Sequence, residues 1–362
     1  MKDLRAWIVS LFIIVSMILT TMAVMASAEG RSRSSARAMA LYSPELDTFL
    51  FTKNADERLP MASTTKIMTA LVTLENTQLD QRITIPREAV GIEGSSLYLE
   101  EGDTLTVKDL LYSLMLRSAN DAATALAIEV GGDIRGFSDM MNARAQELGL
   151  TDTSFSNPHG LDSEDHYTTA KELCLIAAEA LKNETFREIT STYKYSFSLG
   201  DGTRTVVNHN KLLKSYEGAI GVKTGFTKKC GRCLVSAAER DGITLVAVTL
   251  DAPDDWKDHT DILDYGFDTL VSIPIENIAN INFTIPTIGL TSETINATIG
   301  EEVRLIGYKT DKFKVVYDIK KYIVTDTEEG DTVGSVLIYK NGELYKTLRV
   351  VSLDSVKKSQ KG

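Results

Sequence analysis

Segments with the pattern of β-strands lie at both ends of a long helical stretch, and this order limits the folds open to the chain. Near the start, residues 38–41 and 48–52 alternate loosely between apolar and polar side chains. Much further along, 234–238 and 244–250 are apolar runs separated by the turn dipeptide Asp241-Gly242. Strands, then helices, then strands indicate an antiparallel sheet rather than a doubly wound parallel one. The predicted fold class is therefore α+β, an antiparallel sheet flanked by helices with a helical subdomain.

The helical stretch consists of segments in which apolar residues recur three and four positions apart. One such segment follows Ser63, and the others are 107–116, a helix from Asp121 to Gly131-Gly132, 137–148 and 167–181. A last helix, at 265–271, is expected after the second group of strands. The segment 107–116 is strongly apolar, so we expect it to be buried.

The composition changes near Ile273-Pro274, where the chain becomes rich in Ile, Val, Thr and Tyr. Within this part, Asn341-Gly342 separates two strand patterns, which is the strongest short-range signal of a β-hairpin. A chain of 362 residues is long enough for two domains. We expect a larger domain at 29–272, a small β-rich domain at 277–354 and a short basic tail at 355–362.

The first 28 residues have the features of an export signal. Lys2 and Arg5 precede a charge-free run over 6–28, which ends in the small-residue pattern Ala26-Ser27-Ala28 before Glu29. This arrangement predicts a secretory signal peptide, 1–28, and a protein that acts outside the cytoplasm, secreted or at the outer face of the cell membrane. An uncleaved membrane anchor is the alternative reading of the same run.

The net charge and the number of cysteines exclude further classes of protein. The net charge of −11 argues against a nucleic-acid-binding protein. Three cysteines are too few for a disulfide-built scaffold. Cys230 and Cys233 have the spacing of a redox pair, but no βαβ context surrounds them, so we interpret them as structural or incidental. A surface disulfide is the alternative in an oxidising compartment. Cys174 lies in a helical pattern and is expected in the core.

A potential nucleophile and base occur three residues apart at the start of a helix. Ser63 and Lys66 follow Pro60, which suits the approach to a helix start. Residues three apart share a helix face, so the Lys66 amine can reach the Ser63 hydroxyl. A serine hydroxyl needs a base, and a lysine serves as one only when burial or a nearby cation keeps it neutral. Taken alone, a capping serine followed by an exposed lysine is the commoner meaning of this spacing.

Two later motifs offer further groups that could act together with Ser63 and Lys66. Ser118-Ala119-Asn120 stands at a break between two predicted helices, where a loop can present a hydroxyl and an amide to a cleft. Lys223-Thr224-Gly225 lies on a predicted strand, where a cation and a hydroxyl can bind an anion and the glycine permits close approach. Ser-x-x-Lys, Ser-x-Asn and Lys-Thr-Gly in this order are the motif set of β-lactamases and penicillin-binding proteins.

The sequence resembles the low-molecular-mass penicillin-binding proteins that act as D-alanyl-D-alanine carboxypeptidases, over nearly the whole chain that follows the signal. The further matching segments are 62–70, 117–123, 157–162, 166–170 and 223–227. The β-rich segment at the end also looks like the second domain of that family. The resemblance implies the β-lactamase/transpeptidase type of fold, a peptidoglycan stem peptide as substrate, β-lactams as covalent inhibitors, and neither a metal nor another cofactor.

The resemblance also implies a role for each motif residue. Ser63 is the implied nucleophile, Lys66 its base and Ser118 a proton relay; Asn120, Lys223, Thr224 and Gly225 bind the substrate, and the backbone N–H groups of Ser63 and Phe226 form the oxyanion hole. His159, His166 and His209 lie near the motifs, and we interpret them as structural because no spacing suggests a metal site. Asn208 and Asn210 are weaker candidates for lining the cleft.

Two alternative functions share these residues. A DD-endopeptidase that cuts cross-links would use the same site, and a non-catalytic sensor of β-lactams or muropeptides would keep only the binding groups. The intact pair of Ser63 and Lys66 argues against the sensor. A β-lactamase is disfavoured because no Glu-x-x-Leu-Asn segment is found and Ala119 stands where those enzymes usually carry Asp. Membrane association stays open, since 355–362 does not resemble the membrane-binding helix in which many family members end.

Overall fold

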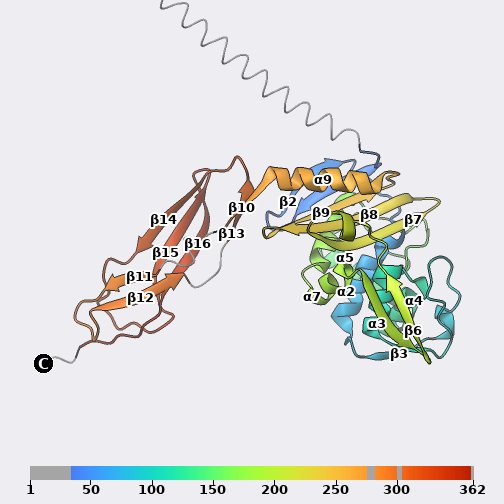
Figure 1. Cartoon of the computed structure of the whole chain (residues 1–362), viewed down its shortest axis with the longest axis horizontal. Helices are drawn as coiled ribbons and strands as arrows, with labels where there is room; N and C mark the ends of the chain where they lie inside the picture. Colours follow the sequence, from blue (N-terminus) through green and yellow to red (C-terminus); the bar gives the residue numbers. More distant parts are fainter. Residues whose placement is uncertain (1–33, 275–281, 300–303, 360–362) are drawn as a thin grey trace, which may run out of the picture. The chain divides into compact units, whose positions relative to one another are not determined.

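The computed structural model of the protein describes residues 34–274, 282–299 and 304–359 (Figure 1). The predicted signal peptide and the last three residues of the predicted tail lie outside these ranges. The chain divides into two compact units. The first runs to Glu239 and includes Thr244–Gly266; the second comprises Arg240–Ile243 and the chain from Phe267 onward.

The first unit contains a five-stranded sheet in the order β2-β1-β9-β8-β7. Its strands are β1 (Ala38–Ser43), β2 (Thr48–Lys53), β7 (Ala219–Thr227), β8 (Gly231–Arg240) and β9 (Ile243–Leu250). The register is antiparallel, with Ala40 opposite Val248 between β1 and β9, and Gly225 opposite Cys233 between β7 and β8. Strand segments from the two ends of the helical stretch therefore share one sheet, which confirms the predicted α+β class.

Helices cover both faces of this sheet. Figure 1 shows α9 (Asp255–Thr269) on one face and α2 (Lys66–Asn76), α5 (Ile134–Glu147) and α7 (Glu184–Ser191) on the other, where α6 (Ala170–Ala180) also packs. On the α9 side, His259 hydrogen-bonds to Ser236 of β8 and Thr249 of β9. On the opposite side, the Cys174 thiol of α6 lies 3.8 Å from the carbonyl oxygen of Ala40. Every residue of β9 is buried, because a strand covered on both faces needs no polar side.

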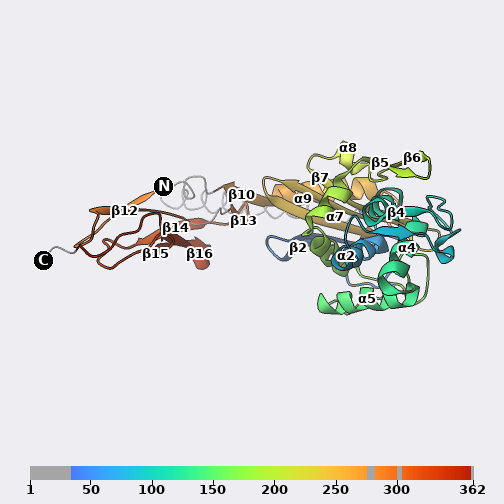
Figure 2. The ribbon, with the colours of Figure 1, turned by 90° about the horizontal axis from the view of Figure 1, so that it is seen from below.

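The elements between the sheet strands form the helical subdomain, seen from below in Figure 2. They are the 3₁₀ turns η1 (Ala62–Thr65) and η2 (Arg87–Ala89), the π-helical turn η3 (Ser113–Arg117), the helices α2 (Lys66–Asn76), α3 (Val107–Tyr112), α4 (Asn120–Gly131), α5 (Ile134–Glu147), α6 (Ala170–Ala180), α7 (Glu184–Ser191) and α8 (Leu212–Ser215), and two small antiparallel pairs, β3 (Arg82–Thr84) with β4 (Thr104–Thr106) and β5 (Lys194–Leu199) with β6 (Gly202–Val207).

Two details of the predicted helices were wrong. The last helix was expected at 265–271, but α9 begins ten residues earlier and Val271 belongs to the strand β10 (Leu270–Pro274). The first half of α9 escaped prediction because it buries Asp255, Asp258 and His259, so it lacks an apolar stripe there. The short helix α7 was not predicted either, although Asn183 caps its start.

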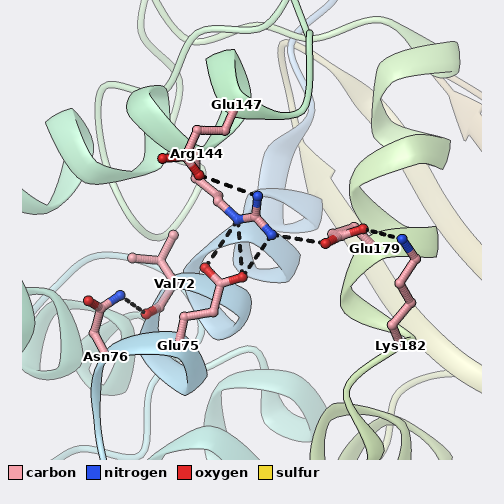
Figure 3. A network of polar contacts seen from close by, with 7 residues as sticks. All are labelled: Val72, Glu75, Asn76, Arg144, Glu147, Glu179 and Lys182. Carbon is pink, nitrogen blue, oxygen red and sulfur yellow. Dashed lines mark hydrogen bonds and ion pairs between the residues drawn. The ribbon is translucent and has the colours of Figure 1, made fainter.

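Arg144 of α5 joins three helices of the subdomain (Figure 3). Its guanidinium contacts Glu75 of α2 at 3.0 Å and Glu179 of α6 at 2.9 Å. Lys182 contacts the second oxygen of Glu179 at 2.7 Å. The Arg144 side chain is only 21% exposed, so these pairs are better shielded than surface ion pairs. The network holds the far end of α2, the helix whose first residue is Lys66.

From Leu270 onward, the described part of the second unit contains strands and no helix. Its five-stranded sheet has the order β11-β12-β16-β15-β14, and β10 pairs with β13. The bounds are β11 (Phe283–Pro286), β12 (Thr294–Ile299), β13 (Arg304–Tyr308), β14 (Phe313–Ile319), β15 (Thr332–Lys340) and β16 (Glu343–Ser352). The predicted hairpin is confirmed, since Asn341 and Gly342 connect β15 to β16 and both have positive φ. Within the described ranges, no helix has the length and apolarity needed to span a bilayer.

Candidate active site

Ser63 and Lys66 lie at the junction between η1 and α2. The Nζ of Lys66 is 3.0 Å from the Oγ of Ser63. The local helix type differs from the expectation: Ser63 stands in a 3₁₀ turn, and the α-helix begins only at Lys66. The tighter turn still brings the side chains at positions i and i+3 together, because they nearly eclipse each other in a 3₁₀ helix.

The Lys66 amine is enclosed by acceptors and has no exposed surface. Besides Ser63, it contacts Oδ1 of Asn120 at 2.7 Å and the carbonyl oxygen of His159 at 2.6 Å. Burial, and then the charge of Lys223, hold the pKa of Lys66 well below its usual value, while Asp121 opposes the shift. A neutral amine has two N–H groups for Asn120 and His159, which leaves its lone pair for the Ser63 hydroxyl.

Ser118 stands at the predicted break between helices, after η3 and before α4. Its φ of 64° is in the left-handed region, which is uncommon for a residue with a side chain. Asn120 opens α4 and donates from Nδ2 to the Glu93 carbonyl oxygen at 2.5 Å, while its backbone N–H donates to the Ser95 carbonyl oxygen at 2.7 Å. Asn120 therefore connects Lys66 to the loop that contains Ser95.

Asp121 fixes this loop from within the protein, a contact that the sequence did not reveal. Its carboxylate accepts from the hydroxyl of Ser96 at 2.6 Å and from the backbone N–H groups of Leu97 and Leu99 at 3.0 and 3.1 Å. The carboxylate is buried, and these donors stabilise its charge there. Its effect on the site is to hold residues 95–99 against the start of α4.

The strand β7 supplies the third motif. Lys223 is buried, and its Nζ donates to the Thr224 carbonyl oxygen at 3.0 Å. Burial lowers the pKa of Lys223 to about 7. Gly225 lies against the Ser63 turn: a β-carbon at this position would be 3.1 Å from the backbone nitrogen of Ser63. The absence of a side chain at Gly225 is thus what allows β7 to approach the nucleophile candidate.

A cavity of about 460 Å³ opens at this junction. Its lining comprises Ser63, Ser95, Ser118, His209, Lys211, Thr224, Gly225, Phe226, Arg232, Asp255 and Trp256. Five residues predicted from sequence are on its wall, and three more, Lys66, Asn120 and Lys223, are buried residues that do not line it. Asn208 and Asn210, the weaker candidates for the cleft wall, do not line this cavity, whereas His209 does.

One wall of the cavity carries positive charge that sequence reasoning missed. Arg232 places Nη2 at 2.9 Å from each carboxylate oxygen of Asp255. The Lys211 ammonium and the Arg232 guanidinium lie 5.8 and 5.9 Å from the centre of the Trp256 ring. No motif surrounds these residues in the sequence, and only the pairing of β8 with β7 and the start of α9 bring them to the site.

The loop formed by residues 157–162 contacts the Lys66 amine through the carbonyl oxygen of His159. Asn157 Oδ1 accepts from the Gly160 backbone N–H at 2.7 Å, which turns the His159 carbonyl toward Lys66. Gly160 has a φ of +85°, and a β-carbon there would lie 1.9 Å from the Ala62 carbonyl oxygen. Glycine is therefore required at this close approach.

The histidines near the site are neutral. His166 Nδ1 accepts from the backbone N–H of Ser156 at 3.1 Å, so its Nε2–H faces the Thr65 hydroxyl at 2.7 Å. Burial lowers the pKa of His159 to about 3 and that of His166 to about 4. Within the described part of the chain, no three His, Cys, Asp or Glu side chains form a cluster that could hold a metal ion.

Comparison with known proteins identifies the family of this chain. Residues 24–254 match the peptidase S11 model, described as D-alanyl-D-alanine carboxypeptidase. The curated relatives include D-alanyl-D-alanine carboxypeptidase DacF of Bacillus subtilis, 31% identical over 90% of this chain and 86% of its own. Another is the D-alanyl-D-alanine carboxypeptidase of Streptomyces sp. K15, 40% identical over 61% of this chain and 83% of its own.

Solved structures agree. The Streptomyces K15 DD-transpeptidase is 38% identical and superposes with a TM-score of 0.62 over 65% of this chain and 97% of that one. The D-alanyl-D-alanine carboxypeptidase DacD of Francisella tularensis is 25% identical, with a TM-score of 0.64 over 90% of this chain and 94% of that one. The family model spans well over half of the chain, and the protein therefore belongs to the D-alanyl-D-alanine carboxypeptidase family of serine peptidases.

Proposed function

We propose that Ser63 is the nucleophile of this enzyme, a serine-type D-alanyl-D-alanine carboxypeptidase, and that Lys66 takes its proton. The observation that carries the proposal is the 3.0 Å approach of Lys66 Nζ to Ser63 Oγ, made by an amine whose pKa burial holds well below its usual value. A lysine in this state has a free lone pair and can act as a general base at neutral pH.

The reaction would follow from this pair. Ser63 Oγ bonds to the carbonyl carbon of the penultimate D-alanine of a peptidoglycan stem peptide, and the bond to the terminal D-alanine nitrogen breaks. Ser118 delivers a proton to that nitrogen, so D-alanine leaves as an amine. Water then cleaves the acyl-enzyme. β-Lactams acylate the same Ser63, and the opened ring stays attached to it.

The other motif residues would bind the substrate. Asn120 holds both Lys66 and the substrate amide, while Thr224, together with the charge of Lys223, receives the terminal carboxylate. Lys211 on the cavity wall adds positive potential for the same anion, whereas Asp255 on that wall compensates the charge of Arg232. The backbone N–H groups of Ser63 and Phe226 would stabilise the oxyanion, which is worth about 3–4 kcal/mol per donor. The closeness of Gly225 to the Ser63 nitrogen supports this assignment.

The cellular setting follows from the substrate. Peptidoglycan lies outside the cytoplasm, so the enzyme acts there, and residues 1–28 would be the signal peptide that exports it. We assign catalysis to the domain at 29–272 and leave the small β domain, 277–354, without a catalytic role.

One labelling experiment tests the nucleophile. Purified protein is incubated with a fluorescent penicillin, digested, and the labelled peptide identified by mass spectrometry. We expect the label on Ser63, no label in Ser63→Ala, and unchanged labelling in Ser215→Ala, which removes an exposed hydroxyl on α8. A label on another residue, or full labelling of Ser63→Ala, would overturn the assignment.

A second experiment separates the possible activities. Diacetyl-Lys-D-Ala-D-Ala and a cross-linked muropeptide dimer are offered separately, and free D-alanine and monomer are quantified. Release of D-alanine at the higher kcat/KM supports the carboxypeptidase. Faster cleavage of the dimer would favour an endopeptidase, and tight binding with no cleavage of either would favour a sensor.

A further inference from the structure

Two cysteines lie at the tip of the hairpin that forms one wall of the active site. Cys230 is the last residue of the turn 228–230 between β7 and β8, and Cys233 stands in β8 directly opposite Gly225. Both thiols are free and buried, with 2% and 0% of the residue exposed. The mechanism proposed above uses neither of them.

Cys230 contacts both the Thr227 hydroxyl and Cys233, whose Sγ lies 3.9 Å from the Cys230 carbonyl oxygen. Cys230 Sγ lies 2.9 Å from Thr227 Oγ1, which also accepts the Cys230 backbone N–H at 3.1 Å. A thiol–thiol hydrogen bond with Cys233 lowers the pKa of Cys230 to about 7 and raises that of Cys233. Cys230 is thus the more readily ionised of the two, although burial and the charge of Asp162 oppose its ionisation.

This cysteine pair connects three segments that build the active site. The Thr227 hydroxyl donates to Asp162 at 3.0 Å, at the end of the loop that supports Lys66. Cys233 Sγ lies 3.9 Å from the carbonyl oxygen of Pro60, three residues before Ser63. A covalent change at the pair would therefore act on β7 and on both of its neighbours.

We propose that Cys230 and Cys233 are a redox-active pair that closes to a disulfide and braces the β7–β8 hairpin. The Cys230 thiolate attacks an external disulfide and expels one thiol. The Cys233 thiol, after losing its proton, then displaces the second thiol from the mixed disulfide. Two electrons pass to the external disulfide, which is reduced to two thiols, and two protons leave the cysteines. The co-reactant is a low-molecular-mass disulfide or the disulfide of a thiol oxidase.

The expected consequence is a stiffer active-site wall. Cys233 faces Gly225, and Gly225 packs against the Ser63 backbone nitrogen, so a bond between the cysteines restrains the strand that lines the cavity. Because a disulfide restricts the unfolded chain, oxidation should raise the thermal midpoint by a few degrees. The oxidising setting rests on the proposed extracytoplasmic location, but the bond itself does not depend on the role of Ser63.

The test is a redox titration of the whole folded protein in glutathione buffers of increasing oxidised fraction. Each sample is quenched in acid, denatured and alkylated, and the mass of the intact protein is then measured by mass spectrometry. We expect three alkyl groups on the reduced protein and one on the oxidised protein, since Cys174 stays free. Cys174→Ala should lose one group in each state. Cys230→Ser/Cys233→Ser should carry one group throughout, with a thermal midpoint that does not respond to the buffer.

Three outcomes would overturn the proposal: three alkyl groups at every buffer ratio, a stable mixed adduct with glutathione as the end product, or a disulfide that leaves the thermal midpoint of the wild type unchanged. Penicillin labelling is recorded in the same samples. If Ser63 fails to label while the disulfide forms, the proposed function fails and this inference stands. If Ser63 is labelled and no disulfide forms, this inference fails and the proposed function stands.

Discussion

The Nζ of Lys66 and the Oγ of Ser63 lie 3.0 Å apart, across one turn of a 3₁₀ helix that leads into α2. The remaining contacts of this amine, to Asn120 and to the His159 carbonyl, come from two other parts of the chain. A neutral amine that donates to these two acceptors can accept the Ser63 proton through its lone pair, yet keeping a buried lysine uncharged weakens the fold.

Replacing Lys66 with methionine should separate activity from stability. Penicillin acylation is expected to fall by about 10²- to 10⁴-fold, because the general base is lost. The thermal midpoint should rise at pH 7, because the wild-type chain must release a proton from Lys66 when it folds. In the pH range between the lowered folded pKa and the unfolded value, the unfolded chain binds one more proton, so wild-type stability increases with pH. The advantage of the variant should therefore shrink toward pH 10, as measured by denaturant unfolding. A variant less stable than wild type at pH 7 would contradict this account.

The charge of Lys223 should appear in the pH profile. Its pKa is about 7 in the free enzyme, so its positive charge is present below that pH and is lost as the pH rises through it. If this charge receives the terminal carboxylate, kcat/KM for diacetyl-Lys-D-Ala-D-Ala should decline above about pH 7, since this parameter reports the free enzyme. The matched methyl ester, which lacks the negative charge, should show no such decline. Parallel profiles for the two substrates would remove Lys223 from carboxylate recognition.

Alanine at Gly160 should harm both fold and catalysis. The new β-carbon would lie 1.9 Å from the Ala62 carbonyl oxygen at a φ of +85°, so the loop must move and withdraw the His159 carbonyl from Lys66. We expect a loss of about 3 kcal/mol in unfolding free energy and at least tenfold slower acylation. Gly149→Ala is the control, because its φ is +74° but the surrounding space is open. It should cost only about 1–2 kcal/mol and leave acylation intact. Equal effects of the two substitutions would show that the close contact is unimportant.

Ser118 offers a test of backbone strain at a functional residue. Both Ser118→Ala and Ser118→Gly remove the hydroxyl, so we expect both to lose at least about 10²-fold in turnover. The glycine variant should nevertheless be more stable than the alanine variant by about 1 kcal/mol, because φ is 64° at this position. Thermal unfolding and D-alanine release measure the two effects. Retained turnover in the glycine variant would exclude the proposed proton relay.

Much of the candidate site was predictable because its residues stand in short local patterns. The spacing of Ser63 and Lys66, the helix break at Ser118 and the strand at Lys223 are each set by a few neighbouring residues. Asp121, Lys211 and Arg232 were not predicted, because each is an ordinary charged residue until the fold gives it a partner. The first half of α9 was missed for a related reason: its buried residues are polar, and their partners are distant in sequence.

The sequence by itself determined the order of strands and helices, the Asn341-Gly342 hairpin and the residue types available for acyl transfer, since these depend on periodicity and local turn chemistry. Only the tertiary structure decided the burial and the pKa of those residues. The pKa of Lys66 falls because the chain around Asn120, His159 and Lys223 buries its amine, and burial of an amine far from solvent is a property of packed segments rather than of any one segment. The contact between Cys230 and Cys233 likewise depends on the pairing of β7 with β8.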